Sequence, residues 1–105
     1  MKKVIGFDMS ETISRYPEQC CMLAESLRKD GWKIIIISPN PINELNADID
    51  KYGMRPFIDD IVNRGDKGRV CAEYDVAVFL DDNDGYLKQV FDREISTMPL
   101  QVLRK

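Results

Sequence analysis

Acidic residues and a serine follow three separate runs of apolar residues in this chain. Asp8 follows the first run, Ser38 the second, and the pair Asp81 and Asp82 a later one. Carboxylates clustered without histidine or thiolate are hard oxygen ligands, and they suit Mg²⁺, which binds through a few carboxylates, waters and substrate phosphate. A hydroxyl and an ammonium group beside that metal, here Ser38 and Lys67, suit a phosphoryl group, whose transfer depends on charge neutralisation and positioning. A carboxylate held against such a phosphate can itself attack phosphorus.

These residues can meet only if the elements that contain them form one sheet. Short runs of mostly β-branched or aromatic residues predict strands at residues 4–7, 32–37, 57–62, 76–80 and 99–103. Apolar residues at helical spacing predict helices over residues 17–30, 41–52 and 67–74 and after residue 85. Strands that alternate with helices of this length imply right-handed βαβ units and a parallel sheet. The predicted fold is therefore α/β, a three-layer Rossmann-like domain with a mainly parallel sheet.

The strand ends are the informative positions in such a sheet. Ligands bind beyond the carboxyl ends of parallel strands, where the chain leaves the sheet. Asp8, Ser38 and the acidic pair each end a predicted strand, and Lys67 begins the helix before the strand of the pair. We therefore expect these side chains to converge on one edge of the sheet.

The predicted helices should each turn one apolar face toward the sheet. The residues expected on those faces are Cys20, Leu23, Ala24, Leu27, Ile42, Leu45, Ile49, Tyr52, Leu87, Val90 and Phe91. Asn40 is expected to cap the helix that begins at Pro41, because asparagine is a favoured residue at that position.

Composition excludes several classes of function. The chain has 105 residues, enough for one domain with a small core. Its 15 basic and 18 acidic residues leave neither half basic, so we expect no duplex nucleic acid or anionic membrane as a partner, and no apolar run is long enough to span a membrane. The absence of histidine excludes Ser-His-Asp and Cys-His catalysis and histidine metal ligands. Three cysteines without a C-x-x-C pair argue against disulfides and zinc and predict a reducing, cytoplasmic location.

Four short motifs resemble those of the haloacid dehalogenase superfamily and appear in the family's order. D-M-S-E-T at residues 8–12 resembles the first motif, D-x-D-x-T, and residues 34–38 resemble the second, an apolar strand ending in serine or threonine. Lys67 resembles the third motif, and residues 76–82 resemble the fourth, an apolar strand ending in an acidic pair. The resemblance implies a single domain over residues 1–105, with five strands in the order 5-4-1-2-3.

The resemblance also implies a role for each matching residue. Asp8 would be the nucleophile and a ligand of Mg²⁺. Ser38 would bind the transferring phosphoryl group, and Lys67 would stabilise the nucleophile and the phosphate charge. The other implied roles are metal ligation by the main-chain carbonyl of Ser10 and by Asp81, a metal contact through water by Asp82 or Asp84, phosphate binding by Met9 and Ser10, and support of the first loop by Thr12.

One position departs from the family pattern, because Ser10 stands where the first motif has its second aspartate. In family phosphatases that aspartate protonates the leaving group and later deprotonates the attacking water. A serine hydroxyl does neither well near neutral pH, and general acid–base catalysis contributes about 10²–10⁴-fold in rate. We therefore expect a Mg²⁺-dependent phosphohydrolase or phosphotransferase that acts through an aspartyl-phosphate on Asp8, with weak activity on alkyl phosphates.

The spacing of the motifs leaves no room for the cap domain that many members of the family contain. Only residues 9–16 separate the first strand from the first helix, and about twenty residues separate the second and third strands. Without a cap, the substrate or another subunit must exclude water from the site. This favours a bulky phosphorylated substrate, such as a phosphoprotein or a nucleic-acid end, or a homo-oligomer.

Two other classes of function fit parts of the pattern. A degenerate module that holds a phosphorylated ligand or partner would keep this fold, with Ser10 as the sign of lost turnover. A phospho-accepting receiver domain also has aspartate, serine or threonine, and lysine at strand ends. Receivers place the acidic pair on the first strand and the lysine after the fifth, whereas here the pair follows the fourth strand and Lys67 precedes it. The residue order therefore argues against a receiver and leaves the enzyme and the binding module open.

Overall fold

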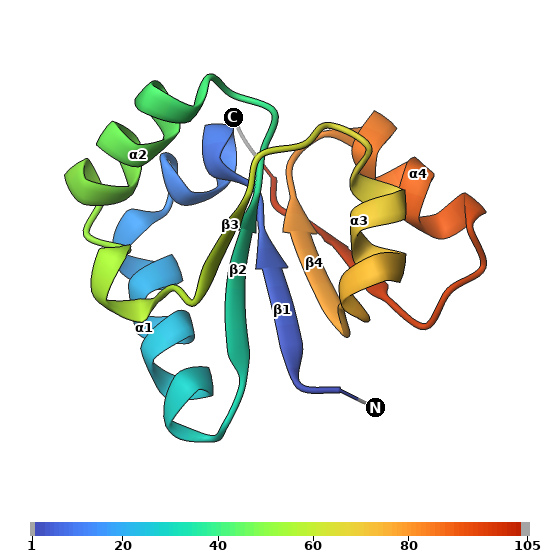
Figure 1. Ribbon diagram of the computed structural model, residues 1–105, viewed down its shortest axis with the longest axis horizontal. Helices are drawn as coiled ribbons and strands as arrows, with labels where there is room; N and C mark the ends of the chain where they lie inside the picture. Colours follow the sequence, from blue (N-terminus) through green and yellow to red (C-terminus); the bar gives the residue numbers. More distant parts are fainter. Residues whose placement is uncertain (1, 104–105) are drawn as a thin grey trace.

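A five-stranded sheet lies between two layers of helices in the computed structural model, which describes residues 2–103 (Figure 1). Its strands are β1 (Val4–Phe7), β2 (Lys33–Ile37), β3 (Asp60–Val62), β4 (Val78–Asp81) and β5 (Met98–Gln101). They lie in the order β3-β2-β1-β4-β5, and every neighbouring pair is parallel. This is the predicted Rossmann-like α/β fold, and the predicted strand order is the same set of neighbours read from the opposite edge.

The helices are divided between the two faces of the sheet. They are α1 (Pro17–Lys29), α2 (Ile42–Lys51), α3 (Lys67–Tyr74) and α4 (Asp84–Asp92), with short helical turns η1 (Met9–Ile13) and η2 (Arg55–Phe57) in the loops. Figure 1 shows α1 and α2 on one face and α3 and α4 on the other. Among residues 2–103, no helix combines the length and apolarity that crossing a membrane requires.

Two apolar clusters hold the layers together, one on each face. Strand β2 contributes to both, since Ile34 and Ile36 pack on the α1 side while Ile35 and Ile37 pack on the α3 side. All four side chains are fully buried, as expected for a parallel strand covered on both faces. The loops that follow the carboxyl ends of β1, β2 and β4 therefore begin at strands that are packed into the core.

Three apolar residues that were expected in the core are exposed. The exposed fractions are 39% for Leu23, 45% for Ile42 and 73% for Phe91. Leu23 precedes the buried Ala24 and Phe91 follows the buried Val90, so both lie beside the buried stripe of their helix, whereas Ile42 is exposed as the first residue of α2. Consecutive helix residues point about 100° apart, so a one-residue offset is enough to turn a side chain out of the core.

The predicted cap at Asn40 is wrong. Helix α2 begins at Ile42, Pro41 occupies its N-terminal flanking position, and no side chain caps it. The side-chain amide of Asn40 instead donates a hydrogen bond to Ser10 Oγ at 3.0 Å. The third strand is also shorter than predicted, because residues 55–57 form η2 before the chain enters β3.

Candidate active site

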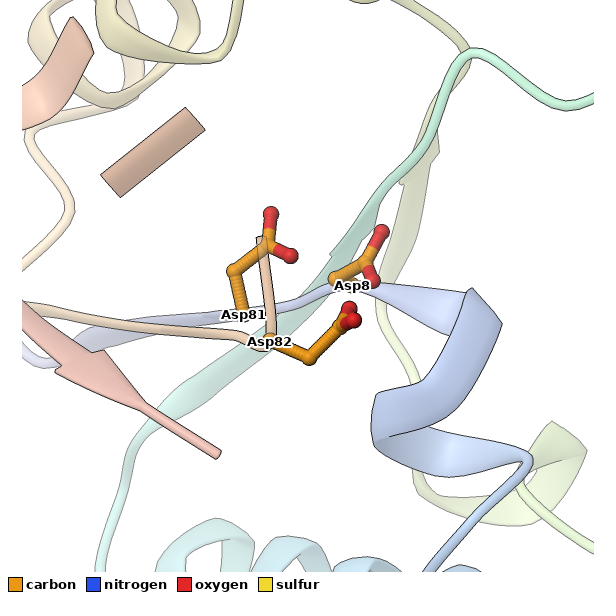
Figure 2. A group of neighbouring side chains, drawn as sticks. All are labelled: Asp8, Asp81 and Asp82. Atoms are coloured by element: carbon orange, nitrogen blue, oxygen red, sulfur yellow. The ribbon is translucent and has the colours of Figure 1, made fainter. Parts of the chain in front are cut away.

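Three carboxylates meet at the carboxyl ends of β1 and β4 (Figure 2). The two strands are neighbours, with Phe7 paired to Leu80, so the residues that follow lie side by side. The backbone N–H of Asp8 donates to the carbonyl of Leu80 at 2.9 Å, which continues the ladder into the site. Asp8, Asp81 and Asp82 each offer an oxygen, and these oxygens lie within 4.8 Å of one another. The predicted convergence of Asp8 with the acidic pair is therefore observed.

The ammonium group of Lys67 joins two of these carboxylates. Lys67 is the first residue of α3 and is fully buried. Its Nζ donates to Asp8 Oδ1 at 2.6 Å and to Asp81 Oδ2 at 2.8 Å. The ring of Tyr86 lies 4.1 Å from the same nitrogen and adds a cation–π contact. A buried charge needs such partners, because an unpaired ion pays a large desolvation penalty.

The carboxylates of Asp8 and Asp81 each accept a further hydrogen bond besides the one from Lys67. Asp81 Oδ1 accepts from the backbone N–H of Asn83 at 3.0 Å. Asp8 Oδ2 accepts from the hydroxyl of the buried Thr12 at a longer 3.4 Å. Asp8 Oδ2 is therefore the less tightly bonded of the two oxygens of that carboxylate.

The site has an excess of negative charge. With all groups ionised, Asp8 and Asp81 bring two negative charges against the single positive charge of the Lys67 ammonium that they share. Burial raises the pKa of Asp8 from 3.8 to about 7; Lys67 opposes this rise, and the neighbouring Asp81 adds to it. The Asp8 carboxyl therefore binds a proton near neutral pH when no other cation compensates its burial.

The donor set fits a hard divalent cation. It consists of carboxylate oxygens alone, the ligand type that Mg²⁺ prefers. Lys67 engages one oxygen of Asp8 and one of Asp81, and Asp82 adds a third carboxylate to the same group. A cation would also offset the net negative charge of the site.

A small cavity of about 170 Å³ opens beside the carboxylates. Four of the predicted site residues line it, namely Asp8, Ser10, Asp81 and Asp82. The residues that the sequence did not predict as lining are Glu11, Pro39, Asn40, Asn83 and Tyr86.

The other predicted residues lie behind or beside this cavity. Ser38 is buried, and its Oγ accepts from the backbone N–H of Asn40 at 3.2 Å, which leaves the hydroxyl proton free to donate. The side chain of Met9 is fully buried in the core, so its main chain alone can reach a ligand. Asp84 is exposed at the start of α4, where its carboxylate accepts from the side-chain amide of Gln101. The structure therefore groups Asp82, and not Asp84, with Asp8 and Asp81.

Asn63 supports the loop after β2 and was not predicted. Its side-chain amide donates to the carbonyl of Ser38 at 2.9 Å and to that of Asn40 at 2.6 Å. Asn63 directly follows β3, the edge strand next to β2. Residues just beyond the carboxyl ends of parallel strands are the ones expected near a ligand, and applying this to the short strand β3 would have identified Asn63.

Of the residues predicted from the sequence, the structure brings Asp8, Lys67, Asp81 and Asp82 into one cluster. Ser10 faces the same cavity, and Ser38 lies buried at the end of the adjacent strand β2. Comparison of the chain with protein-family models, with curated proteins and with solved structures found no match.

Proposed function

We propose that this protein is a Mg²⁺-dependent phosphohydrolase or phosphotransferase of the haloacid dehalogenase type, which acts through an aspartyl-phosphate on Asp8. The observation that supports this most directly is the bonding of the Asp8 carboxylate. It is buried at a strand end, Lys67 holds one of its oxygens at 2.6 Å, and it borders a cavity shared with Asp81 and Asp82. A carboxylate fixed beside cationic groups is suited to nucleophilic attack on a phosphoryl group.

Each residue has a defined task in this proposal. Asp8, Asp81, Asp82 and the main-chain carbonyl of Ser10 would hold Mg²⁺, which when bound neutralises charge on the phosphoryl group. An Asp8 oxygen forms a bond to phosphorus while the bond from phosphorus to the leaving oxygen breaks. Lys67, which contacts the Asp8 carboxylate, stabilises the developing charge. Water, or another acceptor, then takes the phosphoryl group and regenerates the Asp8 carboxylate.

Ser38 would position the phosphoryl group through its hydroxyl proton. Its oxygen already accepts from the backbone N–H of Asn40, so the hydroxyl is oriented before a ligand arrives. Asn63 holds the same loop in place through two backbone carbonyls. Positioning of this kind is the main requirement of phosphoryl transfer.

The size of the cavity bears on the substrate. Pockets that enclose a drug-sized ligand span roughly 300–1,000 Å³, whereas this cavity measures about 170 Å³. The phosphoryl end of a substrate fits it, and the remainder must lie on the surface of the protein. We therefore propose a bulky phosphorylated substrate, such as a phosphoprotein or a nucleic-acid end, or closure of the site by a second copy of the chain. The three cysteines are unpaired, which supports a reducing, cytoplasmic location.

Release of phosphate from an aryl phosphate, with and without Mg²⁺, tests the proposal. Aryl leaving groups need little protonation, so the replacement of the acid by Ser10 matters least there. Mg²⁺-dependent release that Asp8→Asn abolishes and Asp84→Asn preserves would support the Asp8 nucleophile. Asp84 is the matched control, because it is an exposed aspartate outside the cluster. Equal release by Asp8→Asn would contradict the proposal.

A binding module is the second candidate, and the observation that favours it is Ser10. Its hydroxyl is exposed and accepts a hydrogen bond from Asn40 at 3.0 Å, and it cannot act as the acid that the family motif supplies. No phosphate release together with retained binding of Mg²⁺ would favour this alternative. If the missing acid is the main defect, Ser10→Asp should raise turnover of alkyl phosphates by about tenfold or more.

A further inference from the structure

A second cavity, of about 570 Å³, lies at the opposite edge of the sheet from the carboxylate cluster. The end of α1, the turn into β2, and η2 with the residue before β3 line it. Because all the strands are parallel, the amino ends of β2 and β3 lie at the edge away from the candidate active site (Figure 1). The volume falls in the range of roughly 300–1,000 Å³ that pockets for small ligands span.

Two aromatic side chains, Trp32 and Phe57, line this cavity. Both are half-buried against the apolar cluster on the α1 side, so part of each ring remains accessible. The backbone holds Trp32 in place, because its N–H donates to the carbonyl of Leu27 at 3.0 Å and Gly31, with a φ of 85°, turns the chain out of α1. Accessible rings at a cavity offer a flat apolar surface on which a planar ligand can stack.

Arg28 supplies fixed hydrogen-bond donors at the same cavity. Its Nη2 donates to Asp59 Oδ1 at 2.8 Å, its Nε to Asp59 Oδ2 at 3.5 Å and its Nη1 to the carbonyl of Pro56 at 3.5 Å. Asp59 is held in turn by the backbone N–H of Ile34 at 2.8 Å. A guanidinium has five N–H groups, so these bonds, which are those it makes within residues 2–103, leave one N–H on each terminal nitrogen. Two donors in one rigid plane match a ligand with two adjacent acceptors.

The charges on the lining favour an uncharged ligand. Arg28 pairs with Asp59 at 2.8 Å, and Lys29 pairs with Glu25 at 3.2 Å. The two basic and two acidic residues of the lining therefore balance, and a phosphate alone would meet no excess of positive charge.

Among planar ligands, guanine has the matching edge. Its N7 and O6 are adjacent acceptors, and an arginine bonded to both is the commonest specific contact to a base. Adenine has a donor amino group beside N7, so it can satisfy only one of the two donors of Arg28.

We infer that this cavity binds a guanine base, which stacks on Trp32 and Phe57 and accepts two hydrogen bonds from Arg28. A free nucleotide and a guanine within single-stranded nucleic acid offer the same chemistry. No residue of the lining belongs to the carboxylate cluster or borders its cavity. The inference is therefore independent of the proposed function, and a bound base leaves the candidate active site open.

The fluorescence of Trp32 tests the inference directly, because it is the only tryptophan of the chain. Guanosine is the probe: it has no phosphate, and a chelator in the buffer removes any metal from the carboxylate cluster. We expect saturable quenching by guanosine in the parent protein and equally in Asp8→Asn. Adenosine, and 7-deazaguanosine, which lacks the N7 acceptor, should bind about tenfold or more weakly.

Two variants separate the contacts, with binding measured by calorimetry. Arg28→Lys keeps the charge and loses the planar pair of donors, so it should weaken guanosine binding by about tenfold or more. Arg69→Lys is the matched control, because it changes an exposed arginine of α3 outside the cavity, and it should bind as the parent does. Trp32→Leu removes the stacking surface and should also weaken binding by about tenfold.

The source of the base follows from a second ligand, an unphosphorylated trinucleotide with one guanine between two thymines. Binding at least as tight as that of guanosine would support the inference with single-stranded nucleic acid as the source. Binding of guanosine alone would support it with a free nucleotide.

Three outcomes would overturn the inference. One is the absence of a saturable change in Trp32 fluorescence up to the solubility of guanosine. Another is equal binding of adenosine or 7-deazaguanosine by the parent protein, a result that does not depend on how any variant folds. The third is unchanged guanosine binding in Arg28→Lys. None of these outcomes bears on the Asp8 mechanism, which phosphate release tests separately.

Discussion

The Nζ atom of Lys67 lies 2.6 Å from Asp8 Oδ1, although the two residues are 59 positions apart in the chain. The same nitrogen lies 2.8 Å from Asp81 Oδ2, so a single buried ammonium group joins the ends of β1 and β4 to the start of α3. These contacts preassemble the acidic site before any other cation binds. Because Lys67, Asp8 and Asp81 form this buried contact, the stability of the protein depends on the same groups as its proposed chemistry.

Replacing Lys67 by methionine should destabilise the protein strongly. The variant leaves Asp8 and Asp81 facing each other without their shared counter-charge, and removing one partner of a buried ion pair costs about 3–5 kcal/mol. Chemical denaturation measures the change in the free energy of unfolding. Lys88→Met, which removes an exposed lysine paired with Asp92, should change it little. Similar losses in the two variants would show that the buried bridge contributes no more than a surface pair.

Without divalent cations, the protein should lose stability as the pH rises from 4 to 7. The pKa of Asp8 is about 7 in the folded protein, against 3.8 for the exposed group, because burial disfavours its charged form. Between these values the unfolded chain has released the proton and the folded protein keeps it. The bound proton on Asp8 therefore stabilises the folded protein. This stabilisation is complete below the lower pKa and disappears as the pH passes the upper one, a change in the free energy of unfolding of roughly 4 kcal/mol at most.

Thermal unfolding across this pH range, in the presence of a chelator, measures the effect. Asp8→Asn should remove most of the dependence, because the amide does not titrate. The chain contains no histidine, so no histidine titrates in the same range. A parent protein that becomes more stable from pH 4 to 7 would contradict the raised pKa of Asp8.

Binding of Mg²⁺ should raise the melting temperature at pH 8, where Asp8 is ionised. A ligand at a hundredfold excess over its Kd adds about 2.7 kcal/mol to the free energy of unfolding. Asp81→Asn should abolish the increase, because Asp81 supplies one of the three clustered carboxylates. Asp84→Asn should retain it. An increase of equal size in all three proteins would mean that Mg²⁺ binds elsewhere.

A side chain at position 68 should push α3 away from α4. A Cβ on Gly68 would lie 2.7 Å from the carbonyl oxygen of Gln89, which belongs to the backbone of α4 and cannot move alone. Gly68→Ala should therefore destabilise the protein by about 1–3 kcal/mol, despite the better helix propensity of alanine.

Gly85→Ala is the comparison for this substitution. Its Cβ would meet the side chain of Asn83 at 3.1 Å, and a side chain can shift, so the loss should be smaller. Urea denaturation of the two variants gives the comparison. Unchanged or increased stability in Gly68→Ala would show that the two helices separate easily, and that the position of Lys67, next in the chain, does not depend on their contact.

Local patterns in the sequence predicted most of the elements and their order. The four consecutive isoleucines of β2 indicated a strand buried on both faces, and Pro17 marked the first residue of α1, as the structure has it. These features depend on neighbours a few positions apart, so composition and periodicity are enough to predict them. Leu23 and Phe91 were misplaced because the width of the buried stripe depends on what packs against each helix.

The sequence by itself also determined which residues could meet, because parallel strands bring their carboxyl ends to one edge of the sheet. Asp8, Asp81 and Asp82 were placed there by that rule alone. Only the tertiary structure decided how they are bonded. The ammonium group of Lys67 lies between two carboxylates, the side-chain amide of Asn40 donates to Ser10 Oγ instead of capping α2, and Glu11 borders the cavity. Such contacts join residues far apart in the chain or depend on side-chain direction, and both follow from packing and strand register rather than from local sequence pattern.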